Sequence, residues 1–323
     1  MRILVTGGAG YIGSITSKTL LDRGFEVVIF DNLERGHREA VDSRAKFVQG
    51  DLRNTDDLEK LFSDNKFDAI MHFAGLISVE ESEKDPELYK ENNVTGSKNL
   101  FDKALEKGVN KIIFSSTAAV YGNPQKIPIP EDHPKNPTSQ YGRTKLEIEE
   151  YLAELYGKDD SFSFVCLRYF NACGATPDGS MGEAHSPETH IIPLAIKAAQ
   201  EGREFKLFGT DYDTPDGTCV RDYIHVLDLV EAHILALDKI SNETGGYYYN
   251  VGTGKGFSNK EIIEKVKEVS GREFGVVEEE RRAGDADRLI ADPSKINQEL
   301  GFAPKYSDID TIIQSAWKWH SKR

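Results

Sequence analysis

The chain has 323 residues, of which 38% are hydrophobic, and a formal net charge of −14 at pH 7. This is enough apolar material for one large core, or for a core and a smaller lobe. The negative charge argues against nucleic acid or an anionic membrane as a partner, and no stretch approaches the roughly 20 apolar residues of a membrane span.

The three cysteines, Cys166, Cys173 and Cys219, are too few and too scattered for a disulfide framework or a zinc site. We interpret them as reduced thiols of a cytoplasmic protein. The N-terminus does not read as a secretion signal, because glycines break the apolar run at once.

Short β-branched runs alternate with helical patterns through the first half of the chain. The predicted strands are 3–6, 26–30, 47–49, 69–73, 111–115 and 162–168, and the predicted helices include 12–23 and 88–107. The strands show little polar alternation, as in strands that are buried on both faces. The pattern predicts an α/β fold with a doubly wound parallel sheet of the Rossmann type, whose ligands bind at the carboxyl ends of the strands.

A glycine-rich turn connects the first predicted strand to the first helix. Gly7, Gly10 and Gly13 have the spacing G-x-x-G-x-x-G, which permits a tight turn and a close approach of the backbone to a pyrophosphate. The helix N-terminus then offers free N–H groups to the anion. A plain turn is the alternative, but the position between a strand and a helix favours a dinucleotide site.

Asp31 ends the second strand about 20 residues later, where a carboxylate can bind the hydroxyls of the adenosine ribose. Because a carboxylate repels a 2′-phosphate, we expect NAD rather than NADP. The alternatives are an Asp that starts a turn with Asn32, and an NADP site served by Arg35. After the third strand, Asp51 and Leu52 are candidates to meet the adenine.

The alternation of strands and helices ends after residue 168. Long polar loops follow at 171–190 and 210–217, and helical patterns return at 226–239, 259–269 and 309–319. We expect a smaller, mixed α/β substrate-binding lobe. The predicted boundaries are 1–170 for the NAD-binding domain, with a return segment at 220–251, and 171–219 plus 252–323 for the lobe.

Tyr141 and Lys145 are separated by one turn of a predicted helix and share a face. Tyrosine has a pKa near 10, so a tyrosine base needs a nearby cation such as this ammonium or a nicotinamide. Thr117 ends the run of hydroxyls that follows a buried strand, and it is the candidate to bond the substrate oxygen. A surface tyrosine beside a solvated lysine is the alternative, which the preceding hydroxyl run disfavours.

The segment 183–190 has a metal-like composition, with Glu183, His185, Glu188 and His190. The spacing fits no standard zinc pattern, and the loop character argues against a preorganised site. We expect a solvated or substrate-facing loop and no metal.

Three arginines are candidates for contacts with an anionic ligand: Arg168, Arg221 and Arg282. Most arginines are solvated surface residues, and Arg221 lies just before a predicted helix, where its charge has a possible structural role.

Longer stretches accompany these features: 6–13, 72–75, 141–145, 167–171, 216–218 and 220–226. With them the chain resembles the extended short-chain dehydrogenase/reductase family over essentially its whole length, and within that family the nucleotide-sugar 4-epimerases. The last three stretches are far more specific than the glycines.

The resemblance implies a tightly held NAD and a UDP-hexose substrate. UDP-glucose and UDP-galactose would be interconverted by reversible hydride transfer at C4 through a 4-keto intermediate, with Tyr141 as the base. UDP-GlcNAc and UDP-GalNAc are possible further substrates. A homodimer is also expected.

The resemblance also assigns residues to roles. The implied catalytic residues are Thr117, Tyr141 and Lys145. The implied cofactor contacts are Gly7, Gly10, Tyr11, Ile12, Gly13, Asp31, Asn32, Asp51, Leu52, Phe73, Ala74, Gly75, Asn92, Lys145 and Phe170. The implied substrate contacts are Thr117, Tyr141, Asn171, His190, Ile191, Phe208, Arg221, Arg282, Asp285 and Leu289.

The chain departs from some relatives at Ile77, where they carry lysine, and at His190, where they carry asparagine. Leu289 replaces a tyrosine of relatives restricted to unmodified hexoses, so a wider sugar range is expected.

Three other readings compete with the 4-epimerase. A 4,6-dehydratase needs Asp-Glu directly after Thr117, where this chain has Ala118 and Ala119. A 4-epimerase of hexuronic acid sugars stays open. An NAD-sensing protein without catalysis is the rival from another class, although such a protein could lose the catalytic residues that this chain retains.

Overall fold

The computed structural model describes residues 1–282 and 285–323, which form two compact units. Unit 1 comprises 1–122, 135–168 and 230–249, and unit 2 comprises 123–134, 169–229 and 250–323. No helix in the described part of the chain is both long and apolar enough to span a membrane.

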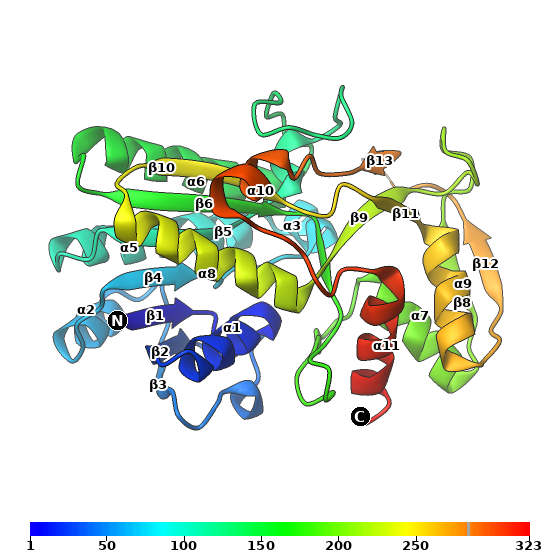
Figure 1. Cartoon of the computed structure of the whole chain (residues 1–323), viewed down its shortest axis with the longest axis horizontal. Coiled ribbons are helices and arrows are strands. Elements are labelled where there is room, and N and C mark those ends of the chain that lie inside the picture. Colours follow the sequence, from blue (N-terminus) through cyan, green and yellow to red (C-terminus); the bar gives the residue numbers. More distant parts are fainter. Residues whose placement is uncertain (283–284) are drawn as a thin grey trace. The chain divides into compact units, whose positions relative to one another are not determined.

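A seven-stranded parallel sheet forms the centre of unit 1, in the order β10-β6-β5-β4-β1-β2-β3 (Figure 1). Its strands are β1 Arg2–Thr6, β2 Glu26–Asp31, β3 Lys46–Gln49, β4 Ala69–His72, β5 Lys111–Thr117, β6 Ser163–Tyr169 and β10 Gly246–Val251. The chain runs outward from β1 to β3 and then resumes on the other side of β1 with β4. The predicted fold class is confirmed, with the reversal of strand order at β1/β4.

Helices cover this sheet and bury its apolar side chains. They are α1 Tyr11–Asp22, α2 Thr55–Ser63, α3 Val79–Lys84, α5 Gly96–Glu106, α6 Gln140–Lys158 and α8 Val226–Asn242, the last running from unit 2 into unit 1. Side chains at the helix starts define several of these boundaries: Asn54 caps α2, Ser78 caps α3 and Ser139 caps α6. Ile3, Leu4 and Val5 of β1 are completely buried, as expected for a strand covered on both faces.

The helix predicted at 88–107 is interrupted. The structure has α4 Pro86–Tyr89, a π-helical segment Lys90–Thr95, and then α5. π-Helical segments occur often at functional sites, because they change which side chains face inward. Here the segment directs the Asn93 side chain toward Leu76, where it accepts from the backbone N–H and donates to the backbone C=O.

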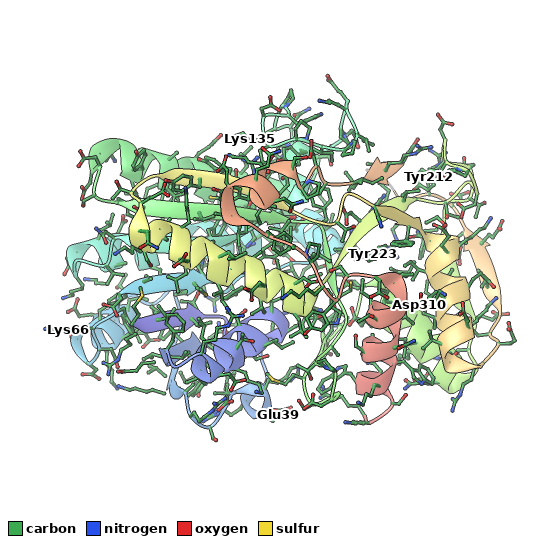
Figure 2. All side chains as sticks on the ribbon, viewed as in Figure 1. Glu39, Lys66, Lys135, Tyr212, Tyr223 and Asp310 are labelled. Carbon is green, nitrogen blue, oxygen red and sulfur yellow. The ribbon has the colours of Figure 1, made fainter. Side chains whose placement is uncertain are left out.

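Unit 2 contains two small sheets and its own core. One sheet combines β7 Asn171–Cys173, β9 Val220–His225, β11 Gly256–Ser258 and β13 Arg288–Leu289, and the other pairs β8 Phe205–Phe208 with β12 Val276–Glu279. The helices are α7 Ile191–Glu201, α9 Asn259–Ser270, α10 Ser294–Leu300 and α11 Ile309–His320. Tyr223, labelled in Figure 2, is one of the buried β9 residues of this core.

The division differs from the expected boundaries in two places. Strand β9 was expected in the return segment, but it pairs with β7, β11 and β13 and belongs to unit 2. Segment 123–134 also joins unit 2, because Ile129 forms a bridge with Ala291 and donates its N–H to Ile290 O. Long-range strand pairing determines both of these boundaries, and no local sequence pattern predicts that pairing.

Candidate functional site

The glycine turn of unit 1 leaves no room for side chains. Gly7 has φ +68°, and a Cβ there would lie 2.5 Å from the Ala74 nitrogen, while a Cβ at Gly13 would lie 2.3 Å from Gly7 O. Gly10 caps α1 without a side-chain hydrogen bond, and the first turn, which includes Tyr11 and Ile12, has no acidic residue. The N-terminus of α1 can therefore receive a pyrophosphate, so these residues fit NAD.

Asp31 lies at the carboxyl end of β2 and is 8% exposed. Its carboxylate accepts from Ala9 N at 3.0 Å and from Leu33 N at 2.8 Å, which ties it to the glycine turn. Burial raises the pKa of Asp31, and the two backbone bonds oppose that effect. The guanidinium of Arg35, the candidate for an NADP contact, pairs with Glu81.

The other strand ends of unit 1 carry the remaining predicted cofactor positions. Asn32 donates to Asp51 Oδ2 at 3.1 Å, which joins the ends of β2 and β3. After β4, a Cβ on Gly75 would lie 3.5 Å from Lys145 Nζ, so this backbone approaches the predicted catalytic lysine. Asn92 lies half-buried on the π-helical segment.

The predicted catalytic residues come together where β5 ends and α6 begins. Thr117 is the last residue of β5, and its hydroxyl is hydrogen-bonded to Tyr141. Lys145, one turn further along α6, donates to Ser115 O at 2.9 Å, and its Nζ lies 5.9 Å from the centre of the Tyr141 ring. The hydroxyl, the phenol and the ammonium are thereby held together by one strand and one helix.

Burial shifts the pKa values of both titratable groups. It raises the pKa of Tyr141 to about 12, with the Thr117 hydrogen bond acting in the opposite direction. It lowers the pKa of Lys145 to about 8. A phenolate here consequently needs a further positive charge, and a nicotinamide cation supplies one when NAD is bound.

Arg168 is not an anion contact, contrary to its candidacy from the sequence. It is 2% exposed, and its Nε and Nη2 donate to the two carboxylate oxygens of Glu149 at 2.9 and 2.6 Å. Ser116 donates to the same carboxylate at 2.6 Å. This buried pair consumes Ser116 and leaves Thr117 as the hydroxyl beside Tyr141. Arg168, which the sequence suggested as an anion contact, is therefore paired with Glu149 in the core.

A buried polar chain that sequence reasoning missed connects the glycine strand to α6. His72 Nδ1 lies 2.7 Å from Thr6 Oγ1, and its Nε2 lies 2.8 Å from Ser97 Oγ. Ser97 donates its only proton to Asn93 O, so His72 Nε2 donates to Ser97 and Nδ1 accepts from Thr6. Burial, followed by the charge of Lys145, lowers the pKa of His72 to about 3 and keeps this ring neutral.

Unit 2 gathers several of the predicted substrate contacts. Arg282 stacks on Phe208 with 4.1 Å from its guanidinium carbon to the ring centre. Arg221 donates to Ala286 O at 2.8 Å and lies 3.5 Å from Asp285, and Leu289 of β13 is its register partner. Arg221 and Leu289 are far apart in the sequence, and the β9/β13 pairing brings them together.

The other predicted positions of unit 2 lie elsewhere in it. Asn171 Nδ2 donates to Asp222 O at 2.9 Å across the β7/β9 pair. Phe170 donates its backbone N–H to Val251 O. His190 caps α7, whose first residue is Ile191, and its Nδ1 lies 2.6 Å from Glu183 Oε1.

Comparison with known proteins identifies the family. Residues 3–252 match the NAD dependent epimerase/dehydratase family. The chain belongs to the NAD dependent epimerase/dehydratase family. It is 49% identical to the UDP-glucose 4-epimerase of Lacticaseibacillus casei, over 99% of this chain and 97% of that protein.

Two solved structures extend the likeness of this family member to three dimensions. UDP-glucose 4-epimerase from Brucella ovis in complex with NAD is 44% identical, with a TM-score of 0.94 over 98% of this chain and 97% of that one. The UDP-Glc/GlcNAc 4-epimerase from Campylobacter jejuni is 43% identical, with a TM-score of 0.87 over 100% of this chain and 99% of that one.

The two residues after Thr117 occupy the positions at which a 4,6-dehydratase was expected to carry Asp-Glu. Here Ala118 and Ala119 begin a short 3-10 helix, Ala118–Tyr121, and Ala119 N donates to Thr117 Oγ1 at 3.1 Å. A methyl group can neither donate nor accept a proton. These two positions therefore supply no acid/base pair for the elimination of water.

Proposed function

We propose that the chain is a UDP-glucose 4-epimerase, which interconverts UDP-glucose and UDP-galactose with bound NAD. The observation that carries the proposal is the convergence of Thr117, Tyr141 and Lys145 beside a glycine turn that can hold a dinucleotide. The full-length identity to UDP-glucose 4-epimerases supports it. A non-catalytic NAD sensor has no need for this alignment of hydroxyl, phenol and ammonium.

When bound, NAD would supply the acceptor for the hydride of C4 of the sugar and the donor for its return. Tyr141 takes the proton of the 4-hydroxyl and gives it back once the keto sugar has presented its other face. Thr117 bonds the same sugar oxygen and the phenol, so it directs the proton between them. Lys145 stabilises the phenolate by its charge, because its own hydrogen bond goes to Ser115 O.

We assign the UDP part of the substrate to unit 2. Arg221 and Arg282 offer guanidinium groups for the pyrophosphate, and Phe208 offers a ring for the uracil. Arg221 Nη1 donates to the backbone oxygens of Val220 and Ala286, and within the described residues its carboxylate neighbour is Asp285, at 3.5 Å. A pyrophosphate can replace this weak partner at small cost.

The sugar range is proposed to include N-acetylated hexoses. Leu289 is a half-buried residue beside Arg221, and it lacks the ring and hydroxyl of a tyrosine. The 43% identity to a UDP-Glc/GlcNAc 4-epimerase favours this wider range. A hexuronate 4-epimerase is the competing specificity. The enzyme is further proposed to act as a homodimer in the cytoplasm.

Incubation of the purified protein with UDP-galactose, without added cofactor, tests the proposal. We expect UDP-glucose to form until the two sugars reach equilibrium, and NAD to be released on denaturation. Side-by-side reactions with UDP-GlcNAc and UDP-glucuronate determine the range. If only UDP-glucuronate is converted, the competing specificity is correct; if no sugar is converted, the catalytic proposal is wrong.

A further inference from the structure

Four groups that can bind metals come together in the segment of unit 2 that leads into α7. They belong to Glu183, His185, Glu188 and His190, and one ligand atom of each lies within 4.8 Å of all the others. His185 Nδ1 and His190 Nδ1 lie 2.9 and 2.6 Å from Glu183 Oε1. His190 Nδ1 also lies 3.2 Å from Glu188 Oε1. The loop thus folds two Glu-x-His pairs onto one another.

The central carboxylate has an unusual environment. Glu183 is 4% exposed, and its Oε1 forms no hydrogen bond in the described part of the chain, although two imidazole nitrogens lie within 3 Å of it. A buried carboxylate is costly unless its charge is compensated. A buried oxygen without a hydrogen bond requires an explanation, and a bound ion beside the two imidazoles is one.

The backbone holds this cluster in place, contrary to the expectation of an unorganised loop. Trp319 of α11 donates its indole N–H to Glu183 O at 2.7 Å; α11 can be found in Figure 2 from Asp310 in its first turn. Glu188 Oε1 accepts from the N–H groups of Thr189 and His190 at 2.7 and 2.9 Å. Both ends of the cluster are consequently anchored.

We propose that Glu183, His185 and His190, with Glu188 as fourth ligand, bind a divalent transition-metal ion. Imidazole nitrogens combined with carboxylates are the ligand set of Zn²⁺, and the two carboxylates balance its charge. Tetrahedral Zn²⁺ with bonds of about 2.0–2.1 Å separates its ligand atoms by about 3.3 Å. The separations of 2.6, 2.9 and 3.2 Å are all shorter than that value, so side-chain rotations must move these ligand atoms apart by up to about 0.7 Å to admit the ion.

The ion has a structural role in this proposal. It cross-links the segment after β7 to His190, the residue that precedes α7, and Trp319 joins that segment to α11. The His190 ring then points to the ion rather than to the sugar nucleotide. The proposal does not rest on the epimerase reaction, and it replaces both the predicted absence of a metal and the predicted substrate contact of His190.

An ion pair without metal is the competing explanation. Burial would lower the pKa of His190, but the carboxylates of Glu183 and Glu188 raise it to about 10. The cluster would then contain an imidazolium at neutral pH. His320 also faces these carboxylates, and burial lowers its pKa. Metal binding and protonation of His190 exclude each other, so a metal titration separates the two explanations.

Co²⁺ titration of the chelator-treated, full-length protein is the test. We expect one equivalent to bind and give visible absorption of a four- or five-coordinate ion, which one equivalent of Zn²⁺ removes. His190→Gln should weaken Co²⁺ binding at least tenfold. His37→Gln is the matched control, because His37 is similarly exposed, at 38% against 42%, and belongs to unit 1.

Thermal unfolding gives a second measurement. Zn²⁺ should raise the midpoint of the wild type and of His37→Gln, and leave that of His190→Gln unchanged. Equal Co²⁺ affinity in wild type and His190→Gln would show adventitious binding and overturn the proposal. A folded wild type that binds no Co²⁺, or gives only the weak spectrum of a six-coordinate aqua ion, overturns it even if the variants fail to fold.

Discussion

Lys145 Nζ donates its hydrogen bond to Ser115 O at 2.9 Å and lies 5.9 Å from the centre of the Tyr141 ring. The lysine thus ties α6 to β5, and its ammonium lies near the phenol ring, as the proposed electrostatic role requires. Glu149, one turn further, binds Ser116 of the same strand. Successive turns of α6 therefore fix the end of β5, which makes the roles of individual residues testable.

Tyr141→Phe should reduce the epimerisation rate by at least ~10²-fold, because it removes the general base. Binding of NAD and UDP-glucose should persist, since the phenyl ring retains the packing. Rates are compared by following UDP-galactose formation, with Tyr156→Phe on the exposed part of α6 as control. Near-normal turnover by Tyr141→Phe would remove this residue from the mechanism.

Lys145→Met should lower the rate and change its pH dependence. Activity needs the Tyr141 phenolate, so the rate rises with pH through the pKa of that phenol. Without the ammonium this pKa increases, and the rising limb should move to higher pH. Lys158→Met, at the exposed end of α6, is the control. An unchanged pH profile would mean that Lys145 serves only the structure.

The same substitution should stabilise the cofactor-free protein at pH 7. Burial lowers the pKa of Lys145 from 10.5 to about 8, so the folded chain binds this proton less tightly than the unfolded chain does. The wild type therefore gains stability as the pH rises from about 8 to 10.5, and it carries the full penalty of the buried charge below about pH 8. Urea unfolding should show an advantage of up to about 3 kcal/mol for Lys145→Met at pH 7 that disappears near pH 10.5.

Asp31→Ser should relax the discrimination against NADP, because it removes the negative charge at the adenosine ribose. Asp31→Asn is the matched variant, since it keeps an oxygen that can accept from Ala9 N. Dissociation constants for both dinucleotides measure the effect. A wild type that binds NADP as well as NAD would contradict the assigned role of Asp31.

Leu289→Tyr should suppress epimerisation of UDP-GlcNAc while sparing UDP-glucose, because the larger side chain fills the space proposed for the N-acetyl group. Leu289→Met conserves volume and should retain both activities. The ratio of kcat/KM for the two substrates is measured. Absence of UDP-GlcNAc turnover in the wild type would refute the pocket argument and leave the UDP-glucose activity standing.

Local sequence patterns predicted the parts of unit 1 that are determined locally. The glycine turn, Asp31 and the Tyr141/Lys145 pair each follow from short spacing, and the parallel order of β1 and β2 follows from alternating strands and helices. The same local reasoning could not find the π-helical segment at 90–95, because its i→i+5 bonds depend on packing around it.

Long-range contacts explain the other differences. Arg168 is of a residue type that often binds anionic ligands, and only the fold brings Glu149 next to it. The placement of β9 in unit 2 depends on pairing with three strands that are distant in sequence. The cluster at 183–190 needs the anchor supplied by Trp319, which lies 136 residues away from Glu183 in the sequence.

The neutral His72 makes the chain from Thr6 to Asn93 a set of one-way donors and acceptors, and Asn93 extends it to Thr144 of α6 at 3.3 Å. A one-way chain has no freedom to reverse when the site gains charge. Hydrogen bonds in the core therefore fix the spacing between β1, which leads into the glycine turn, and α6, which carries Tyr141. Replacement of His72 would alter the distance between the glycine turn and Tyr141, while the chemical groups at both places stay the same.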